Sequence, residues 1–222
     1  MSILSDRRTE KIAEIILENH PQKPEKILVV GCGSGLEAAI LAQKLEAHVV
    51  GIDIVGNFDS EAAKFASLEV GNAMSLRFVD SSFDFVYSYH ALEHIDNPLL
   101  SLKEMKRVLK DGGGYWIGTM NRHRLIGYIG SKNVTFGEKV QWNIADWTAR
   151  LSGKFRNELG AHAGFSSLEL QSFLSNVFST NEEVSNIYYK KLYSSNELLI
   201  TFLHLSHLSR IAYPAIYFMG SK

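Results

Sequence analysis

The sequence predicts an α/β fold, in which a doubly wound and mainly parallel sheet carries helices on both faces. Short runs of β-branched residues alternate with amphipathic or alanine-rich stretches between residues 26 and 120, and parallel strands require crossover connections of this kind. A glycine-rich turn, VGCGSG, joins the first such run to the stretch that follows it. Since 222 residues is within the size range of one domain, we expect a single domain over 1–222.

Local signals give the expected elements in order. Ile12, Ile15 and Ile16 recur on one face of an N-terminal helix that ends near Asn19, before Pro21. Later helices are expected at 36–45, 62–67, 96–109, 166–178 and 195–209, and strands at 27–30, 48–54, 67–72, 83–89, 115–120, 183–190 and 213–220.

The composition disfavours several functional classes. Lys and Arg total 23 and Asp and Glu total 24, and the chain has no long basic run, so nucleic acid is not an expected partner. The one cysteine, Cys32, fits a reducing compartment, and the charged N-terminus lacks the apolar core of a signal peptide. We therefore expect a cytoplasmic location.

The most apolar late segment, 198–208, is too short to span a bilayer and is interrupted by Thr201 and His204. We expect a packed helix here and no stable membrane insertion. Contact with a membrane surface is the alternative that this segment leaves open.

The glycine turn predicts a cofactor that contains a nucleoside. Gly31, Gly33 and Gly35 follow a strand and open a helix, where backbone can approach a ligand closely. Asp53 closes the next strand about twenty residues later, where a carboxylate can accept both hydroxyls of a ribose. The third glycine lies at position 35, whereas the dinucleotide fingerprint G-x-G-x-x-G would need it at position 36, which is Leu36.

Four motifs in order, VVGCGSG, GIDI, SSFDFVYSYHALEHI and RVLKDGGGYWIGT, resemble those of the class I S-adenosylmethionine-dependent methyltransferases. Within that family they look most like enzymes that methylate small molecules, including those of quinone biosynthesis. The resemblance is strong over about 26–120 and weaker after Gly164. It implies a Rossmann-like, seven-stranded sheet with an antiparallel last strand, S-adenosyl-L-methionine as cofactor, S-adenosyl-L-homocysteine as product, and a small-molecule acceptor.

The resemblance also implies which residues hold the cofactor. The glycine turn would pass the methionine half, Asp53 would hold the ribose hydroxyls, and Tyr89 and His90 would lie beside the methionine portion. The complete implied set is Gly31, Cys32, Gly33, Ser34, Gly35, Asp53, Ile54, Asn72, Ala73, Met74, Tyr89 and His90.

Two positions depart from the family pattern. The family often has an acidic residue inside the first strand that contacts the amino group of the cofactor, and this chain has Val29 there. The adenine position more often carries Asp than Asn72, although an amide oxygen can still accept from the adenine amino group.

The string H-x-x-E-H, formed by His90, Glu93 and His94, is also the signature of inverted zinc peptidases. That motif belongs within a long helix, whereas here it follows an apolar β run and Pro98 starts a new helix soon after. We therefore expect no metal. His90 or His94 could act as a general base, and the alternative for His94 is that it orients a loop or caps a helix.

Residues 122–164 lack clear periodicity, which is typical of a lid or a substrate-binding insertion. Trp142, Trp147 and His162 are candidates for acceptor binding, and the alternative is that the aromatic residues only pack the insertion onto the sheet. Arg122 and Arg124, on either side of His123, could meet an anionic acceptor, but such adjacent cations are more often solvated.

The sequence thus predicts a methyltransferase that transfers a methyl group to a small-molecule acceptor by in-line displacement. A non-catalytic, cofactor-binding regulatory module is the first alternative, because the strand acid is missing at Val29. A nicotinamide-dependent oxidoreductase is the second, because it would share the glycine turn and Asp53.

Overall fold

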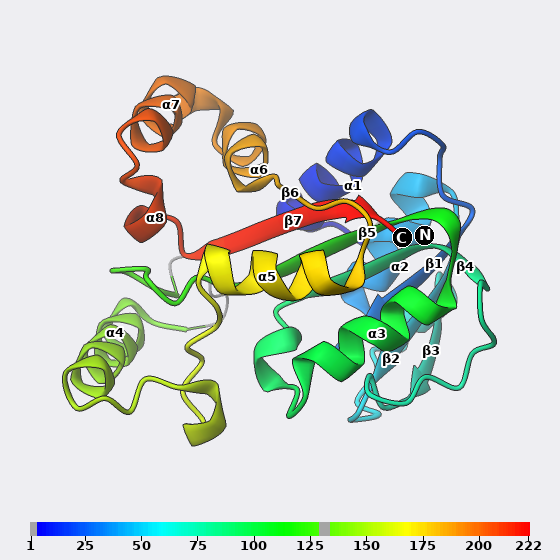
Figure 1. Cartoon of the computed structure of the whole chain (residues 1–222), viewed down its shortest axis with the longest axis horizontal. Coiled ribbons are helices and arrows are strands. Elements are labelled where there is room, and N and C mark those ends of the chain that lie inside the picture. The colour runs from blue at the N-terminus through cyan, green and yellow to red at the C-terminus, as the bar shows by residue number, and fades with distance from the viewer. Residues whose placement is uncertain (1–3, 129–133) are drawn as a thin grey trace.

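The computed structural model describes residues 4–128 and 134–222. Within these residues a seven-stranded sheet has the order β3-β2-β1-β4-β5-β7-β6 (Figure 1). β1 to β5 are parallel, and β7 is antiparallel to β5 and β6, so the predicted sheet is confirmed. The strands are β1 Lys26–Val30, β2 His48–Asp53, β3 Ser67–Val70, β4 Phe83–Tyr89, β5 Leu109–Met120, β6 Glu182–Glu183 and β7 Ala215–Ser221.

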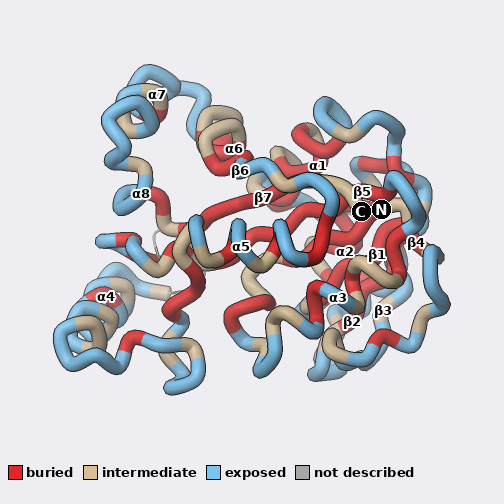
Figure 2. Tube along the Cα trace, viewed as in Figure 1, coloured by how far each residue is buried: buried red, intermediate tan, exposed pale blue. Residues whose placement is uncertain are grey.

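Helices cover both faces of the sheet, as expected. Buried residues of α1, α2 and α6 form one core with the inward side chains of the strands, and residues of α3 and α5 form the other. Figure 2 shows that the buried positions are concentrated along the strands. The helices are α1 Arg7–Asn19, α2 Leu36–Leu45, α3 Pro98–Val108, α4 Phe136–Leu151, α5 Ser167–Val177, α6 Ser185–Leu192, α7 Glu197–Leu205 and α8 Ser209–Ala212. The site described below lies where the two cores meet the carboxyl ends of the strands.

Side-chain caps fix where several helices begin. The Asp6 carboxylate accepts from the Thr9 amide at the start of α1, and the Asn97 side chain accepts from the Leu100 amide at the start of α3. Ser166 and Glu169 form a capping box at α5. These bonds satisfy amides that have no partner within the helix.

The prediction of a strand at 183–190 was wrong. Only Glu182–Glu183 pairs with β7, and the chain then turns into α6. Val184, Ile187 and the tyrosines favour strands by composition, but α6 buries Ser185, Tyr188, Tyr189 and Leu192 along one side of a helix. The helical spacing of these buried positions decided the structure, and the β-propensity of their residue types did not.

Two other expected helices differ in extent. The helix predicted at 62–67 is a single 3-10 turn, Ala62–Lys64, and the one predicted at 195–209 is divided into α7 and α8. The insertion at 122–164 contains the sixteen-residue α4, which begins with a capping box between Thr135 and Glu138. α4 and the α7–α8 segment project beyond the end of β5 (Figure 1).

The apolar segment 198–208 is only partly packed. Ile200 is buried, while Leu198 is 89% exposed and Leu205 is 74% exposed. Among residues 4–128 and 134–222, no helix combines the length and hydropathy that a membrane span needs.

Candidate functional site

The glycine turn lies at the point where the strand order reverses, between β1 and β4, which is where open α/β sheets bind ligands. Gly31 has a φ of 75°, and a Cβ there would lie 2.2 Å from that of Ala91, so the turn and the loop after β4 touch closely. Gly33 has a φ of 52°, and no atom lies within 4 Å of where its Cβ would be. The backbone at Gly33 is therefore open to a ligand.

Asp53 ties the glycine turn to the end of β2. Its Oδ2 accepts from the Gly33 amide at 2.8 Å, and its Oδ1 accepts from the Val55 amide at 3.0 Å. Each carboxylate oxygen keeps a further lone pair, so these bonds orient the carboxylate without using up its acceptor capacity. Burial raises the pKa of the neighbouring Cys32 thiol to about 12, with a contribution from Asp53, so this thiol is a packing residue.

The residues expected at the adenine end lie along the same edge. The Asn72 amide oxygen accepts from the Met74 amide at 2.8 Å, which forms a turn that holds Ala73 at its tip. Ile54 is 69% exposed and follows Asp53, which pairs with Val70 two residues before Asn72. An apolar surface next to an amide group fits the face and edge of a purine ring.

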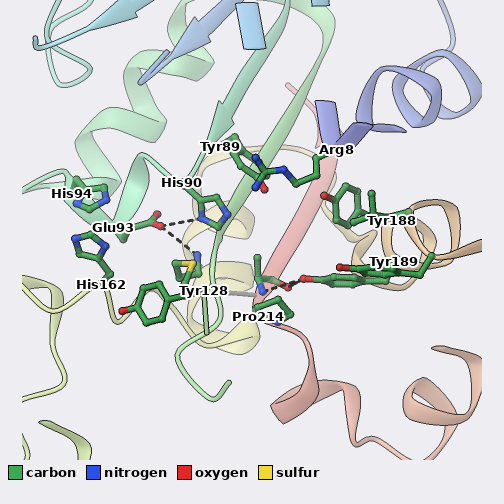
Figure 3. Close-up of a pocket in the computed structure, with 14 residues that line it drawn as sticks. Arg8, Tyr89, His90, Glu93, His94, Tyr128, His162, Tyr188, Tyr189 and Pro214 are labelled. Carbon is green, nitrogen blue, oxygen red and sulfur yellow. Dashed lines mark hydrogen bonds and ion pairs between the residues drawn. The ribbon is translucent and has the colours of Figure 1, made fainter. Parts of the chain in front are cut away.

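A cavity of about 250 Å³ opens where β4 and β5 end (Figure 3). Its wall combines titratable side chains with aromatic ones, and it receives residues from α1, the β4 loop, α6 and the start of β7. The lining residues are Arg8, Tyr89, His90, Glu93, His94, Met120, Tyr128, His162, Tyr188, Tyr189, Leu192, Tyr193, Pro214 and Ala215.

The most organised group in this cavity is the pair formed by His90 and Glu93. The His90 Nδ1 lies 3.2 Å from the Glu93 carboxylate (Figure 3). This carboxylate also accepts from the Thr119 hydroxyl at 2.7 Å. Burial alone would raise the pKa of Glu93, but the hydrogen bonds from His90 and Thr119 outweigh burial and lower it to about 2. Glu93 is thus an anion that orients the imidazole, and it leaves the other ring nitrogen, Nε2, for the cavity.

The backbone at His90 is held in an unusual conformation. His90 has a φ of 51°, a value that non-glycine residues rarely adopt. Its amide donates to the Gly118 carbonyl at 2.8 Å, which anchors the loop on β5. Strained residues of this kind are concentrated at functional sites.

The long helix that a zinc peptidase motif needs is not present at His90 and His94. β4 ends at Tyr89, and Leu92–His94 is a single 3-10 turn. His94 instead contacts His162, with ring centroids 4.7 Å apart. Within residues 4–128 and 134–222, no group of three or more His, Cys, Asp or Glu side chains is arranged so that it could hold a metal ion.

A wider groove of about 940 Å³ continues from the cavity along α4. The two hollows share Tyr128 and His162, and Trp142 lines the groove with its ring centroid 5.1 Å from that of Tyr128. Trp147 does not line either hollow and donates from Nε1 to the Leu125 carbonyl at 2.8 Å. The structure therefore brings His162 and Trp142 to the hollows and uses Trp147 to pack the insertion.

Arg124 anchors the insertion, so the expectation of a solvated or acceptor-facing cation was wrong for this residue. Its side chain is 1% exposed and forms an ion pair of 2.8 Å with Asp146 of α4. The guanidinium also donates to the carbonyls of Asn121, His162 and Ala163. Arg122 likewise pairs with Glu169, at 2.7 Å. Both arginines hold the chain together where the insertion leaves and rejoins the sheet.

Several residues of the cavity were not singled out from the sequence. Arg8 reaches from α1 toward Tyr89, and its Nε lies 3.4 Å from the Asp6 carboxylate (Figure 3). Tyr188 and Tyr189 come from α6, where the sequence predicts a strand. Their signal was the helical spacing of Ser185, Tyr189 and Leu192, whereas Arg8 has no local signal, because a charged residue at a helix start is ordinary.

Comparison with known proteins identifies a methyltransferase domain and several methyltransferases that are similar to this chain. Residues 28–117 match a family described as a methyltransferase domain. The chain is 33% identical over 122 residues to the O-methyltransferase rstn1 of Aspergillus nomiae, covering 50% of this chain and 52% of that protein. It is 30% identical over 132 residues to a ubiquinone biosynthesis O-methyltransferase of Idiomarina loihiensis, covering 53% and 54%. The chain thus spans about half the length of these curated relatives.

Among solved structures, the fold is similar to that of an S-adenosylmethionine-dependent methyltransferase of Thermotoga maritima, described as a possible histamine N-methyltransferase. The TM-score is 0.56 at 20% identity, and the match covers 97% of this chain and 89% of that one. At this identity the likeness concerns the fold, and it includes the elements on both sides of the matched domain.

Proposed function

We propose that this chain is a class I S-adenosylmethionine-dependent methyltransferase, and that it transfers a methyl group to a small-molecule acceptor bound in the cavity at the ends of β4 and β5. The observation that carries the proposal is the His90–Glu93 pair, which stands in that cavity one loop away from the glycine turn. A non-catalytic module gives no reason for an oriented imidazole at this position, and the oxidoreductase alternative, which could also use one, is disfavoured by the match to a methyltransferase domain.

The residues at the glycine turn fit the proposed cofactor, S-adenosyl-L-methionine. The open backbone at Gly33 can receive its middle portion, and the Asp53 carboxylate, already oriented by two amides, can accept from ribose hydroxyls. The turn at Asn72 and the exposed Ile54 offer an amide and an apolar surface to adenine. Arg8, which lines the cavity at the ends of β4 and β5, can form an ion pair with the carboxylate at the methionine end of the cofactor.

When bound, the cofactor supplies an electrophilic methyl group on a sulfonium, and the protein must align an acceptor atom with it. We assign to His90 Nε2 the removal of a proton from an acceptor hydroxyl or amine. Glu93 would stabilise the resulting imidazolium, because its pKa of about 2 keeps it ionised. His94 would act through its contact with His162, by shaping the loop.

The acceptor would enter along the groove beside α4. Tyr128 and His162 lie at the junction of groove and cavity, and Trp142 provides an aromatic wall on the outer side. This arrangement supports a role for 122–164 as the substrate-binding insertion, with Trp147 contributing through its bond to Leu125. A cytoplasmic location is a further proposal, and it rests on the single unpaired Cys32.

Thermal denaturation tests the cofactor. S-adenosyl-L-homocysteine at 100 times its dissociation constant should stabilise the fold by about 2.7 kcal/mol and raise the melting temperature by several degrees. Asp53→Ala should abolish this shift. A wild-type melting temperature that does not change at millimolar ligand would refute the proposal, and a shift with reduced nicotinamide dinucleotide instead would favour the oxidoreductase.

A further inference from the structure

Glu37 lies in the first turn of α2, directly after the glycine turn, and the site described above does not use it. An acid in this position is often explained by the helix dipole alone. Here, however, the carboxylate is held from another element: the Tyr87 hydroxyl donates to its Oε2 at 3.1 Å. A strand residue of β4 therefore fixes where this carboxylate stands.

The register of the sheet relates Glu37 to the missing strand acid. Val29 of β1 is the direct partner of Tyr87 in β4, and both side chains are buried in the core that α1 and α2 cover. Because the Tyr87 hydroxyl donates a hydrogen bond to the Glu37 carboxylate, that carboxylate lies on the side of the sheet toward which the Tyr87 side chain points, over the Val29–Tyr87 pair. It occupies the same side of the sheet toward which an acid at position 29 would point.

The surroundings place the carboxylate next to the cavity. Burial raises the pKa of Glu37 to about 7, opposed by the Tyr87 hydrogen bond and by the charges of His90 and Arg8. Burial and the charge of Glu37 together raise the pKa of Tyr89 to about 12. Glu37 is thus near enough to interact with three residues that line the cavity, Arg8, Tyr89 and His90.

We propose that Glu37 binds the α-ammonium group at the methionine end of the cofactor, in place of the strand acid that is absent at Val29. Tyr87 is the positioning residue, because its hydroxyl holds the carboxylate. Arg8 lines the cavity and its charge acts on Glu37, so it provides the opposite charge for the α-carboxylate. A carboxylate and a guanidinium at one end of a cavity are complementary to an amino-acid zwitterion. This inference rests on the proposed function.

Two ligands separate the amino-acid end from the rest of the cofactor. S-adenosyl-L-homocysteine carries the amino-acid group, and 5′-methylthioadenosine has the same nucleoside and sulfur without it. Glu37→Gln should weaken binding of the first about 10- to 100-fold and change binding of the second less than twofold, because a charged hydrogen bond is lost only with the first. Tyr87→Phe should act in the same direction with a smaller effect.

The binding constants can be measured by calorimetric titration, with two control variants. Asp53→Asn should weaken the binding of both ligands to the same extent, since both contain the ribose. Glu197→Gln, an exposed first-turn acid of α7, should affect neither. If Glu37→Gln weakens the binding of both ligands equally, or of neither, the proposal for Glu37 is overturned while the proposed function still stands. If the wild type binds neither ligand, the proposed function itself fails, and this inference with it.

The pH dependence of the wild type gives a test that does not depend on a variant. Below about pH 7 Glu37 gains a proton, so the preference for S-adenosyl-L-homocysteine over 5′-methylthioadenosine should fall as the pH drops from 8 to 6. The titratable and charged groups that interact with Glu37 are Asp6 and Arg8 of α1, Cys32 of the glycine turn, Tyr87 and Tyr89 of β4, and His90 after β4. In Glu37→Gln the preference should be low and independent of pH. A wild-type preference that stays constant over this range would contradict the assignment.

Discussion

The two halves of the site are built differently. The half over β1 and β2 is formed by neighbours in the chain: the Asp53 carboxylate receives amides from Gly33 and Val55. The half over β4, β5 and β7 is assembled from distant segments, such as Arg8 of α1 and Tyr189 of α6, which bonds to Ala215. The first half would thus offer a fixed frame for the proposed cofactor, and the second could vary with the proposed acceptor.

This difference predicts that substitutions in the second half will affect catalysis far more than cofactor binding. His90→Gln should lower kcat about 10²- to 10⁴-fold, because the proposed base is removed while the glycine turn and Asp53 stay in place. The Kd of S-adenosyl-L-homocysteine should change less than tenfold. Single-turnover rates and calorimetry on the same preparation measure the two quantities. A loss of affinity as large as the loss of rate would mean that His90 belongs to the cofactor half.

The insertion should be separable from the sheet in stability. Arg124→Met leaves Asp146 without its buried partner, and breaking such a pair costs about 3–5 kcal/mol. We expect the loss to be local, so that amide hydrogens of α4 exchange much faster while those of β1 and β4 keep their protection. Arg156→Met, at an exposed cation of the same insertion, is the matched control. Equal loosening of β1 and β4 would show that the two halves form one cooperative unit.

The same difference explains what the sequence could predict. The glycine turn and Asp53 act through a strand–turn–helix unit, so about twenty residues of sequence contain the relevant geometry. Tyr188 and Tyr189 reach the cavity only because 185–192 is a helix, and their β-favouring composition concealed that. Arg124 was expected to be solvated because local sequence does not show that Asp146 and three carbonyls surround it. Burial of this kind is a property of the assembled chain.

A third prediction concerns pH. Glu93 has a pKa of about 2 in the folded protein, below the value of about 4.3 for an unfolded chain. Its contribution to stability is therefore fully present above about pH 4.3 and is lost as the pH falls toward 2, by up to about 3 kcal/mol. Urea unfolding of the wild type and Glu93→Gln between pH 6 and 3 measures this. The difference in free energy of unfolding between them should shrink as the pH falls, and a constant difference would mean that Glu93 is not held as an anion.

The smallest effect is expected at the outer arm formed by α7. Leu205 is 74% exposed, so Leu205→Ser should change the free energy of unfolding by less than about 0.5 kcal/mol, whereas Ile200→Ala, at a buried position of the same helix, should cost about 2 kcal/mol or more. Thermal melts at two protein concentrations provide the measurement. A large or concentration-dependent loss in Leu205→Ser would mean that this face is covered in solution. In that case the arm would be stabilised by an interface and not by its own packing, and the contrast with the cofactor half would be sharper still.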